Sequence, residues 1–100
     1  MQIAPMKIDT VTIDPPVIMA PLVGITDLPF RLIVKKAGCG LVCSEMISAN
    51  GLVHQSAKTL RMLTSDPAEK PLSVQLFGSD PTIVAEAAQR VMETCADILD

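Results

Sequence analysis

Short apolar segments alternate with amphipathic segments along this chain, and this alternation constrains its fold more than any other feature. The clearest amphipathic segment has apolar residues at positions 83, 84, 87, 88, 91, 92 and 95, which form one face of a helix with a 3.6-residue period. Strand and helix signals repeat at steps of roughly 25–30 residues, as expected for parallel β-α units. The apolar segments that we expect to be core strands are 17–20, 40–47, 71–77 and 98–99.

The residues beside two of the amphipathic segments are typical of helix ends. Thr26 or Asp27 can cap a first helix, and Gly38 is placed to end it in a left-handed conformation. Asp80 can cap the last helix, with Pro81 at its first position, where a missing N–H costs nothing. Both helices therefore have defined starting points.

The remaining segments carry weaker signals. Weak alternation over 6–14 predicts a short strand or hairpin at the edge of the fold. The unbroken apolar run at 17–20 predicts a strand buried on both faces. We expect a turn at 48–51, a helix over 52–63 and a polar loop over 64–70.

The order of elements predicts an α/β fold, and a parallel barrel and an open doubly wound sheet both fit the pattern. No G-x-G-x-x-G or G-x-x-x-x-G-K-[ST] motif follows the first strand, which weighs against nucleotide-binding open sheets of those types. The pattern reaches Asp100 inside a strand that no helix covers. Because a full barrel needs about 250 residues, we expect residues 1–100 to be the N-terminal part of a longer protein.

Composition excludes several classes of protein. The net charge is −3 and the basic residues are scattered, so nothing in the charge pattern indicates nucleic-acid binding. No apolar run approaches the roughly 18 residues of a membrane span, and the N-terminus lacks the apolar core of a secretory signal. Three cysteines without C-x-x-C spacing indicate reduced thiols. We expect a cytoplasmic protein.

Polar residues at the ends of the predicted strands are the natural candidates for a site. Glu45 and Gln75 interrupt otherwise apolar strands, and the turn at 20–24 follows the first strand. An unpartnered buried polar group costs about 1–3 kcal/mol, so each should have a specific partner. For Glu45 we expect a partner within the protein, such as Arg31. For Gln75, the hydrogen-bonding partner could equally be a neighbouring backbone group or the edge of a ligand.

Other reactive side chains are better explained structurally. His54 has no second ligand at metal spacing, so we assign no metal site. Cys39 and Cys43 flank a strand entry and are more typical of small core residues than of nucleophiles. Lys58 and Arg61 share a helical face that could meet a phosphate backbone, although a solvated face is the preferred interpretation.

Four motifs together resemble one enzyme family. V-I-M-A-P-L-V-G-I-T-D-L-P-F-R at 17–31 resembles the opening A-P-M-x-G-x-T-D-x-P-F-R motif of the tRNA-dihydrouridine synthases. S-E-M at 44–46, V-Q-L-F-G-S-D-P at 74–81 and I-L-D at 98–100 resemble later motifs of the same family, in the same order and at similar spacing. The bacterial B-type synthases are the subgroup that the chain resembles most.

The resemblance implies a flavoenzyme that uses FMN and NADPH to reduce uridine in tRNA to 5,6-dihydrouridine. It implies that residues 1–100 form the N-terminal portion of a TIM (β/α)8 barrel, about three βα units plus the start of the fourth strand. The rest of the barrel and a C-terminal helical domain would lie outside this chain. It also implies that Pro21, Leu22 and Val23 contact the FMN ring and that Gln75 hydrogen-bonds its polar edge.

Two features depart from the family pattern. Leu22 stands where the family commonly has Met, a change that keeps volume and apolarity. The family's catalytic cysteine would follow Asp100, so no cysteine of this chain is assigned a catalytic role.

Two other interpretations stay open. The chain could belong to another FMN-dependent barrel, such as a dihydroorotate dehydrogenase or an ene-reductase, which share the A-P strand end. It could also be a non-catalytic fragment that folds by association. Because a piece of a barrel exposes strand edges and apolar surface, we expect isolated residues 1–100 to self-associate and to bind FMN poorly.

Overall fold

Three parallel strands form the central sheet of the computed structural model, which describes residues 3–100. They are β3 (Val42–Ser48), β4 (Leu72–Phe77) and β5 (Ile98–Leu99), in the order β3-β4-β5. On the other edge of β3, Ile18 forms a single parallel bridge with Leu41. The parallel sheet and its helical connections confirm the predicted α/β class.

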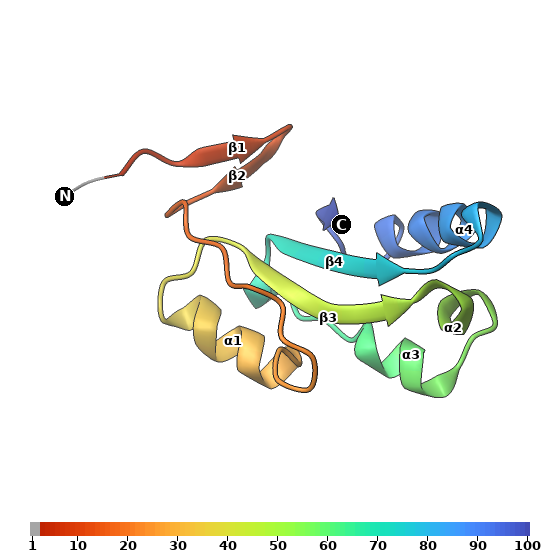
Figure 1. Cartoon of the computed structure of the whole chain (residues 1–100). Coiled ribbons are helices and arrows are strands. Elements are labelled where there is room, and N and C mark those ends of the chain that lie inside the picture. The colour runs from red at the N-terminus through yellow and green to blue at the C-terminus, as the bar shows by residue number, and fades with distance from the viewer. Residues whose placement is uncertain (1–2) are drawn as a thin grey trace.

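Helical segments connect each strand to the next (Figure 1). Helix α1 (Leu28–Lys36) precedes β3, and α4 (Pro81–Met92) joins β4 to β5. The connection from β3 to β4 is longer and contains α2 (Ala49–Val53), α3 (Ala57–Met62) and the 3-10 turn η1 (Pro67–Glu69). The chain therefore repeats a strand-helix unit, as the alternation of apolar and amphipathic segments predicted.

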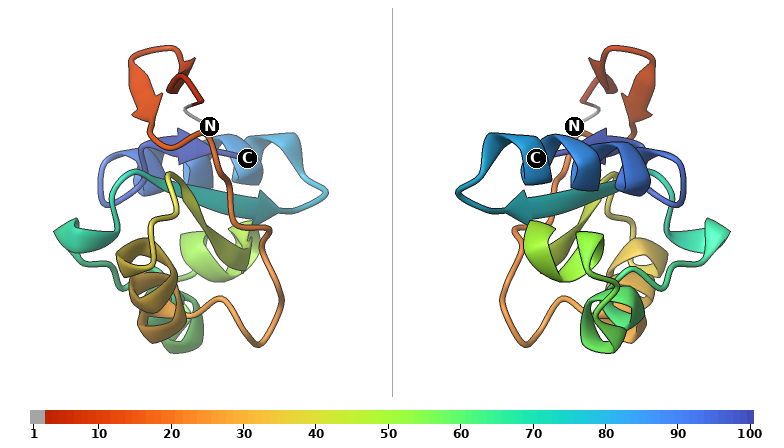
Figure 2. Two further views of the ribbon diagram at one scale, coloured as in Figure 1. Left: turned by 90° about the vertical axis from the view of Figure 1, so that its left-hand side faces the viewer. Right: turned by 90° about the vertical axis from the view of Figure 1, so that its right-hand side faces the viewer.

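An antiparallel hairpin precedes the parallel sheet. Its strands are β1 (Met6–Ile8) and β2 (Val11–Ile13), which confirms the hairpin that was one of two expectations for this segment. Figures 1 and 2 show the hairpin on the opposite side of the sheet from α1 and α3. Ile13, at the end of β2, is fully buried, whereas all three residues of β1 are exposed.

One face of the sheet packs against the helices and forms the core. Val42 and Ile47 of β3 are both fully buried there. These two residues are five positions apart, and in a regular strand an odd separation turns side chains to opposite faces. The other fully packed members of this core are Ala49, Leu52, Leu72, Val74, Ala87 and Val91.

A β-bulge in β3 explains how both residues reach the same face. The register runs from the pair Cys43–Ser73 to the pair Met46–Gln75, so it advances three residues on β3 and two on β4. The extra residue lies at 44–45. A bulge adds one residue to one strand, changes which way the following side chains point, and is rare between parallel strands.

The ends of α1 and α4 follow the sequence signals. The side chain of Asp27 accepts a hydrogen bond of 3.0 Å from the Phe30 backbone N–H, and that of Asp80 accepts one of 2.9 Å from Thr82. Gly38 follows α1 with φ of 110°, a left-handed conformation that favours glycine. The predicted caps are confirmed.

The predicted turn at 48–51 and single helix over 52–63 are wrong. Ser48 is the N-cap of α2, because its side chain accepts a hydrogen bond of 3.0 Å from the Gly51 N–H. The chain then breaks before α3, and Gln55 takes a positive φ of 57° in the break. A serine followed by small residues suits a helix N-terminus as well as a turn.

The prediction that 17–20 is buried on both faces is also wrong. Val17 and Ile18 are 52% and 46% exposed. Within residues 3–100 this segment has a neighbour on one edge only, where Leu41 N–H donates to the Val17 carbonyl at 3.1 Å.

No helix between residues 3 and 100 combines the length and apolarity needed to cross a membrane.

Candidate functional site at the strand ends

The loop between Ile18 and α1 is a tight turn with its own hydrogen bonds. The Leu22 carbonyl accepts from the N–H groups of Ile25 and Thr26, at 3.0 Å each. The Thr26 side-chain hydroxyl lies 3.1 Å from the same carbonyl and 3.2 Å from the Leu22 nitrogen. Gly24 has φ of 78°, the left-handed conformation that a type II turn requires at its third residue. These hydrogen bonds hold residues 21–25 together in one conformation.

Glu45 holds this turn from the neighbouring strand. One carboxylate oxygen of Glu45 accepts a hydrogen bond from the backbone N–H of Gly24. The prediction that Arg31 is the partner of Glu45 is wrong. Glu45 does have a partner within the protein, but that partner is a backbone amide.

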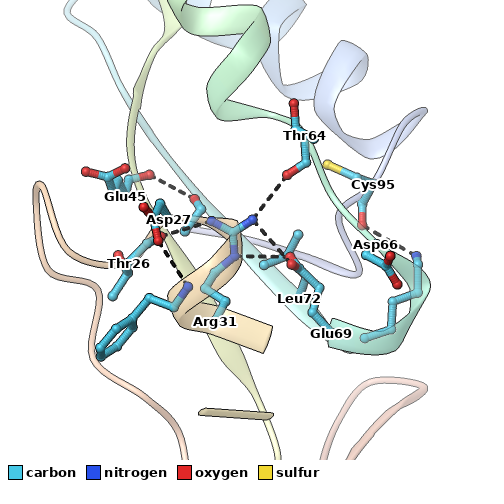
Figure 3. A network of polar contacts seen from close by, with 12 residues as sticks. Thr26, Asp27, Arg31, Glu45, Thr64, Asp66, Glu69, Leu72 and Cys95 are labelled. Carbon is cyan, nitrogen blue, oxygen red and sulfur yellow. Dashed lines mark hydrogen bonds and ion pairs between the residues drawn. The ribbon is translucent and has the colours of Figure 1, made fainter. Parts of the chain in front are cut away.

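Arg31 instead belongs to a buried network (Figure 3). Its Nε lies 3.1 Å from Oε1 of Glu69, and the two side chains are 3% and 0% exposed. Its Nη1 donates to the Thr26 carbonyl at 2.9 Å, and its Nη2 donates to the Thr64 carbonyl at 3.2 Å. Each of the three guanidinium nitrogens thus makes at least one hydrogen bond inside the protein, and the bond from Nη1 holds the Thr26 carbonyl at the end of the turn.

A groove of about 490 Å³ opens where the turn meets the ends of β3 and β4. The apolar residues Val23, Met46 and Phe77 line it, and the charged residues Glu45 and Lys58 line it as well. The remaining lining residues are Gly24, Ser48, Thr59 and Met62. The ends of neighbouring parallel strands are the usual place for a ligand in folds of this class.

A second groove, of about 200 Å³, shares part of this lining. Glu45 and Lys58 face both grooves, and Asp27, Arg31 and Arg61 line the second one. Lys58 and Arg61 are exposed, as the solvated-face interpretation requires. The two acidic side chains offset the two exposed basic ones, so this groove is not strongly basic.

Of the four predicted cofactor-binding residues, Val23 lines the larger groove and the other three do not. Pro21, Leu22 and Val23 are exposed on the turn, and Val23 lines the groove itself. The Val23 N–H makes no hydrogen bond with the residues that the structure describes. Gln75 is half-buried on β4, in register with the groove residue Met46. Its carboxamide also has no hydrogen-bonding partner within residues 3–100.

All three cysteines are free thiols that are partly buried. Burial raises the pKa of the Cys43 thiol, a hydrogen bond with Ser73 opposes this, and Asp100 and Cys39 raise it further. A raised pKa disfavours the reactive thiolate. This agrees with the interpretation of Cys43 as a packing residue. Among residues 3–100, no group of three His, Cys, Asp or Glu side chains is arranged to hold a metal ion.

Sequence reasoning missed two residues that organise this region. Glu69 is fully buried in a segment predicted to be a polar loop, and its partner Arg31 is 38 positions away. Ser44 is 2% exposed and joins the bulge to β4. The odd spacing between Val42 and Ile47 was the available signal for the bulge, since both were expected in the core. No local signal identifies the burial of Glu69.

Comparisons with known proteins identify the family. The family model described as dihydrouridine synthase (Dus) matches residues 18–100. The chain is 40% identical over 95 residues to the tRNA-dihydrouridine synthase B of Pseudomonas aeruginosa, covering 95% of this chain and 29% of that protein. It is 42% identical over 99 residues to a probable tRNA-dihydrouridine synthase of Rhodobacter capsulatus, covering 95% of this chain and 30% of that protein.

A third relative, a probable tRNA-dihydrouridine synthase of Helicobacter pylori, is 44% identical over 73 residues, which cover 73% of this chain and 22% of that protein. The chain thus spans between about a fifth and a third of the length of these relatives. The match of the family model to most of the chain, together with the motifs at the ends of its parallel strands, shows that the chain belongs to the dihydrouridine synthase family.

Proposed function

We propose that the protein carrying this chain is a flavin-dependent oxidoreductase that reduces uridine in tRNA to 5,6-dihydrouridine with NADPH. Residues 1–100 contribute the first part of a TIM (β/α)8 barrel and one side of its FMN site, and the protein acts in the cytoplasm. The observation that carries the proposal is the groove at the strand ends, which is lined by Val23 and by Met46, the register partner of Gln75. The Val23 N–H and the Gln75 carboxamide have no hydrogen-bonding partner among residues 3–100. The proposed reaction is inferred from the relatives, which are named as tRNA-dihydrouridine synthases.

The residues around the groove fit a flavin. The flavin ring has broad apolar faces, which suit the side chains of Val23, Met46 and Phe77. Its pyrimidine edge is uncharged and carries both donors and acceptors, which suit a backbone amide and a carboxamide. In this arrangement Pro21, Leu22 and Val23 contact the ring from the turn, and Gln75 binds the polar edge.

The chain's own contribution is binding and orientation. Bound FMN supplies hydride transfer from NADPH to the uracil ring. The turn at 21–25 and Gln75 of β4 would hold and orient the flavin. We assign no proton donor to any residue of this chain.

Nucleoside analysis of tRNA tests the proposal. Deletion of the gene that encodes this chain should remove dihydrouridine from at least one tRNA position, as measured by mass spectrometry, and re-expression should restore it. The purified gene product should be yellow and should release FMN on denaturation. Unchanged dihydrouridine in a strain whose deletion is verified would contradict the proposed reaction.

A yellow, FMN-releasing protein with no effect on tRNA would indicate a different FMN-dependent barrel oxidoreductase. Assay of dihydroorotate oxidation by the same preparation then distinguishes that class. A colourless preparation that binds no added FMN would contradict both flavoenzyme assignments.

A further inference from the structure

The bulge at Ser44–Glu45 contacts both parts of the proposed flavin site, namely the turn at 21–25 and Gln75 on β4. Glu45 bonds to the turn that carries Pro21, Leu22 and Val23, and Ser44 bonds to Gln75. Two adjacent residues of β3 therefore bond to two different segments of the chain. A bulge is a known means of redirecting a side chain next to a functional site.

Glu45 controls the position of the turn through one backbone group. Its carboxylate accepts the N–H of Gly24, which lies 21 positions earlier in the chain. Within residues 3–100, the other side-chain bonds that hold this segment lie at its end, where the Thr26 hydroxyl bonds to Leu22 and Arg31 donates to the Thr26 carbonyl. Glu45 therefore determines how the middle of the turn, with the neighbouring Val23 N–H, is presented to the groove.

Ser44 controls the backbone of Gln75. The extra residue of the bulge leaves the Gln75 N–H out of step with the strand ladder, and the Ser44 hydroxyl oxygen accepts it at 3.2 Å. The same hydroxyl donates to the Glu45 carbonyl at 2.8 Å. Ser44 is 2% exposed, so no water can replace it easily. It thus fixes the part of β4 from which the Gln75 side chain extends.

We propose that Ser44 and Glu45 are positioning residues for the flavin site. Glu45 sets the turn at 21–25, Ser44 sets Gln75, and the bulge keeps the two halves in a fixed relation. Neither side chain needs to touch the flavin. This inference rests on the proposed flavin site. It predicts which substitutions lower the affinity for flavin while leaving the fold stable.

Four variants of the full gene product isolate the two contacts. Glu45→Gln keeps an acceptor oxygen at the same distance from the backbone, whereas Glu45→Leu removes it at similar size. Ser44→Ala removes the contact with Gln75. Ser73→Ala is its matched control, because Ser73 is also a buried serine of this sheet but bonds to Cys43 rather than to the site.

Titration with FMN measures the effect on binding. Because a lost hydrogen bond to a charged group weakens an interaction appreciably, Glu45→Leu should reduce FMN affinity about tenfold. Ser44→Ala should reduce it about fivefold, and Glu45→Gln should stay within about threefold of the unaltered protein. Ser73→Ala should bind FMN as the unaltered protein does.

Hydrogen exchange of the flavin-free protein measures the contact itself. The amide of Gly24 should exchange faster in Glu45→Leu, while the amides of α1 keep their protection. Glu45→Gln should restore slow exchange. A purely structural role would instead lower protection across α1 and β3 together and would not be rescued by glutamine.

The outcomes separate this inference from the proposed function. If the unaltered protein binds no FMN, the flavin site and this inference both fail. If it binds FMN and Glu45→Leu binds equally well, the positioning role fails while the flavin site stands. If Glu45→Gln is as weak as Glu45→Leu, the acceptor role of the carboxylate is overturned.

Discussion

The Arg31 guanidinium and the Glu69 carboxylate form a buried ion pair that joins α1 to η1, with 3.1 Å between Nε and Oε1. The two residues are 38 positions apart, and both side chains are almost completely shielded from water. Because Arg31 also donates to the Thr26 carbonyl, the pair ties the base of the 21–25 turn to the end of the β3–β4 connection. A buried polar network thus supports the turn, and Arg31 of that network also lines the second groove.

Breaking this pair should destabilise the protein strongly. Glu69→Ala leaves Arg31 buried without its counter-charge, which should lower the free energy of unfolding by about 3–5 kcal/mol. Urea denaturation of the full gene product measures this. Glu86→Ala is the control, because Glu86 forms an exposed pair with Arg90 at 3.0 Å, and its loss should cost less than about 0.5 kcal/mol. Equal losses in the two variants would contradict the prediction.

Two glycines should respond very differently to alanine. Gly24 has φ of 78° and open space around it, so Gly24→Ala should cost about 1–2 kcal/mol from backbone strain alone. At Gly40 a Cβ would clash with the Pro15 carbonyl oxygen, so Gly40→Ala should cost about 3 kcal/mol. Urea denaturation ranks the two, and a larger loss for Gly24→Ala would contradict this assignment.

Loss of the Gln75 carboxamide should weaken flavin binding without unfolding the protein. Gln75→Leu keeps the size of a half-buried side chain but removes groups proposed to bind the polar edge of FMN, so affinity should fall about tenfold. Fluorescence titration with FMN measures the change. Gln89→Leu, at an exposed position of α4, is the matched control and should bind FMN normally. Unaltered affinity in Gln75→Leu would remove Gln75 from the site.

Alkaline pH should reduce stability through Cys43. Burial raises the pKa of this thiol in the folded state, so above the ordinary thiol pKa of about 8.5 the unfolded state has lost a proton that the folded state retains. The thiol's contribution is therefore fully present below that pH and is lost as the pH rises toward the folded-state pKa. Unfolding free energies between pH 7 and 10 should fall more steeply for the unaltered protein than for Cys43→Ala. Parallel curves would contradict the prediction.

A polypeptide of residues 1–100 alone should self-associate and bind FMN poorly. The strand edge at Ile18 has an open side among the described residues, and Val17, Met46 and Phe77 also expose apolar surface. Exposed strand edges and apolar patches favour association. Light scattering over a range of concentrations measures the oligomeric state. A monodisperse monomer with stoichiometric flavin would refute this expectation.

Local signals predicted the elements whose ends are set by neighbouring residues. The caps at Asp27 and Asp80, the left-handed Gly38 and the strands that became β3 and β4 all follow from patterns a few residues long. The family resemblance also rested on such patterns, and the comparisons confirm it. The predicted helix over 52–63 failed because its periodicity did not reveal that Gln55 breaks it.

Partners distant in sequence could not be predicted in the same way. The choice of Glu69 rather than Glu45 for Arg31 depends on which carboxylate the fold brings within reach, and the sequence contains no distance information of that kind. The bulge at 44–45 likewise depends on how β3 pairs with β4.

The sequence by itself determined the parallel strand-helix order, the helix caps and the family, because each depends on short-range patterns. The tertiary structure alone decided that Glu45 holds Gly24, that Ser44 holds Gln75 and that Arg31 is neutralised by Glu69. The physical reason is that a buried polar group bonds to whatever complementary group packing places beside it.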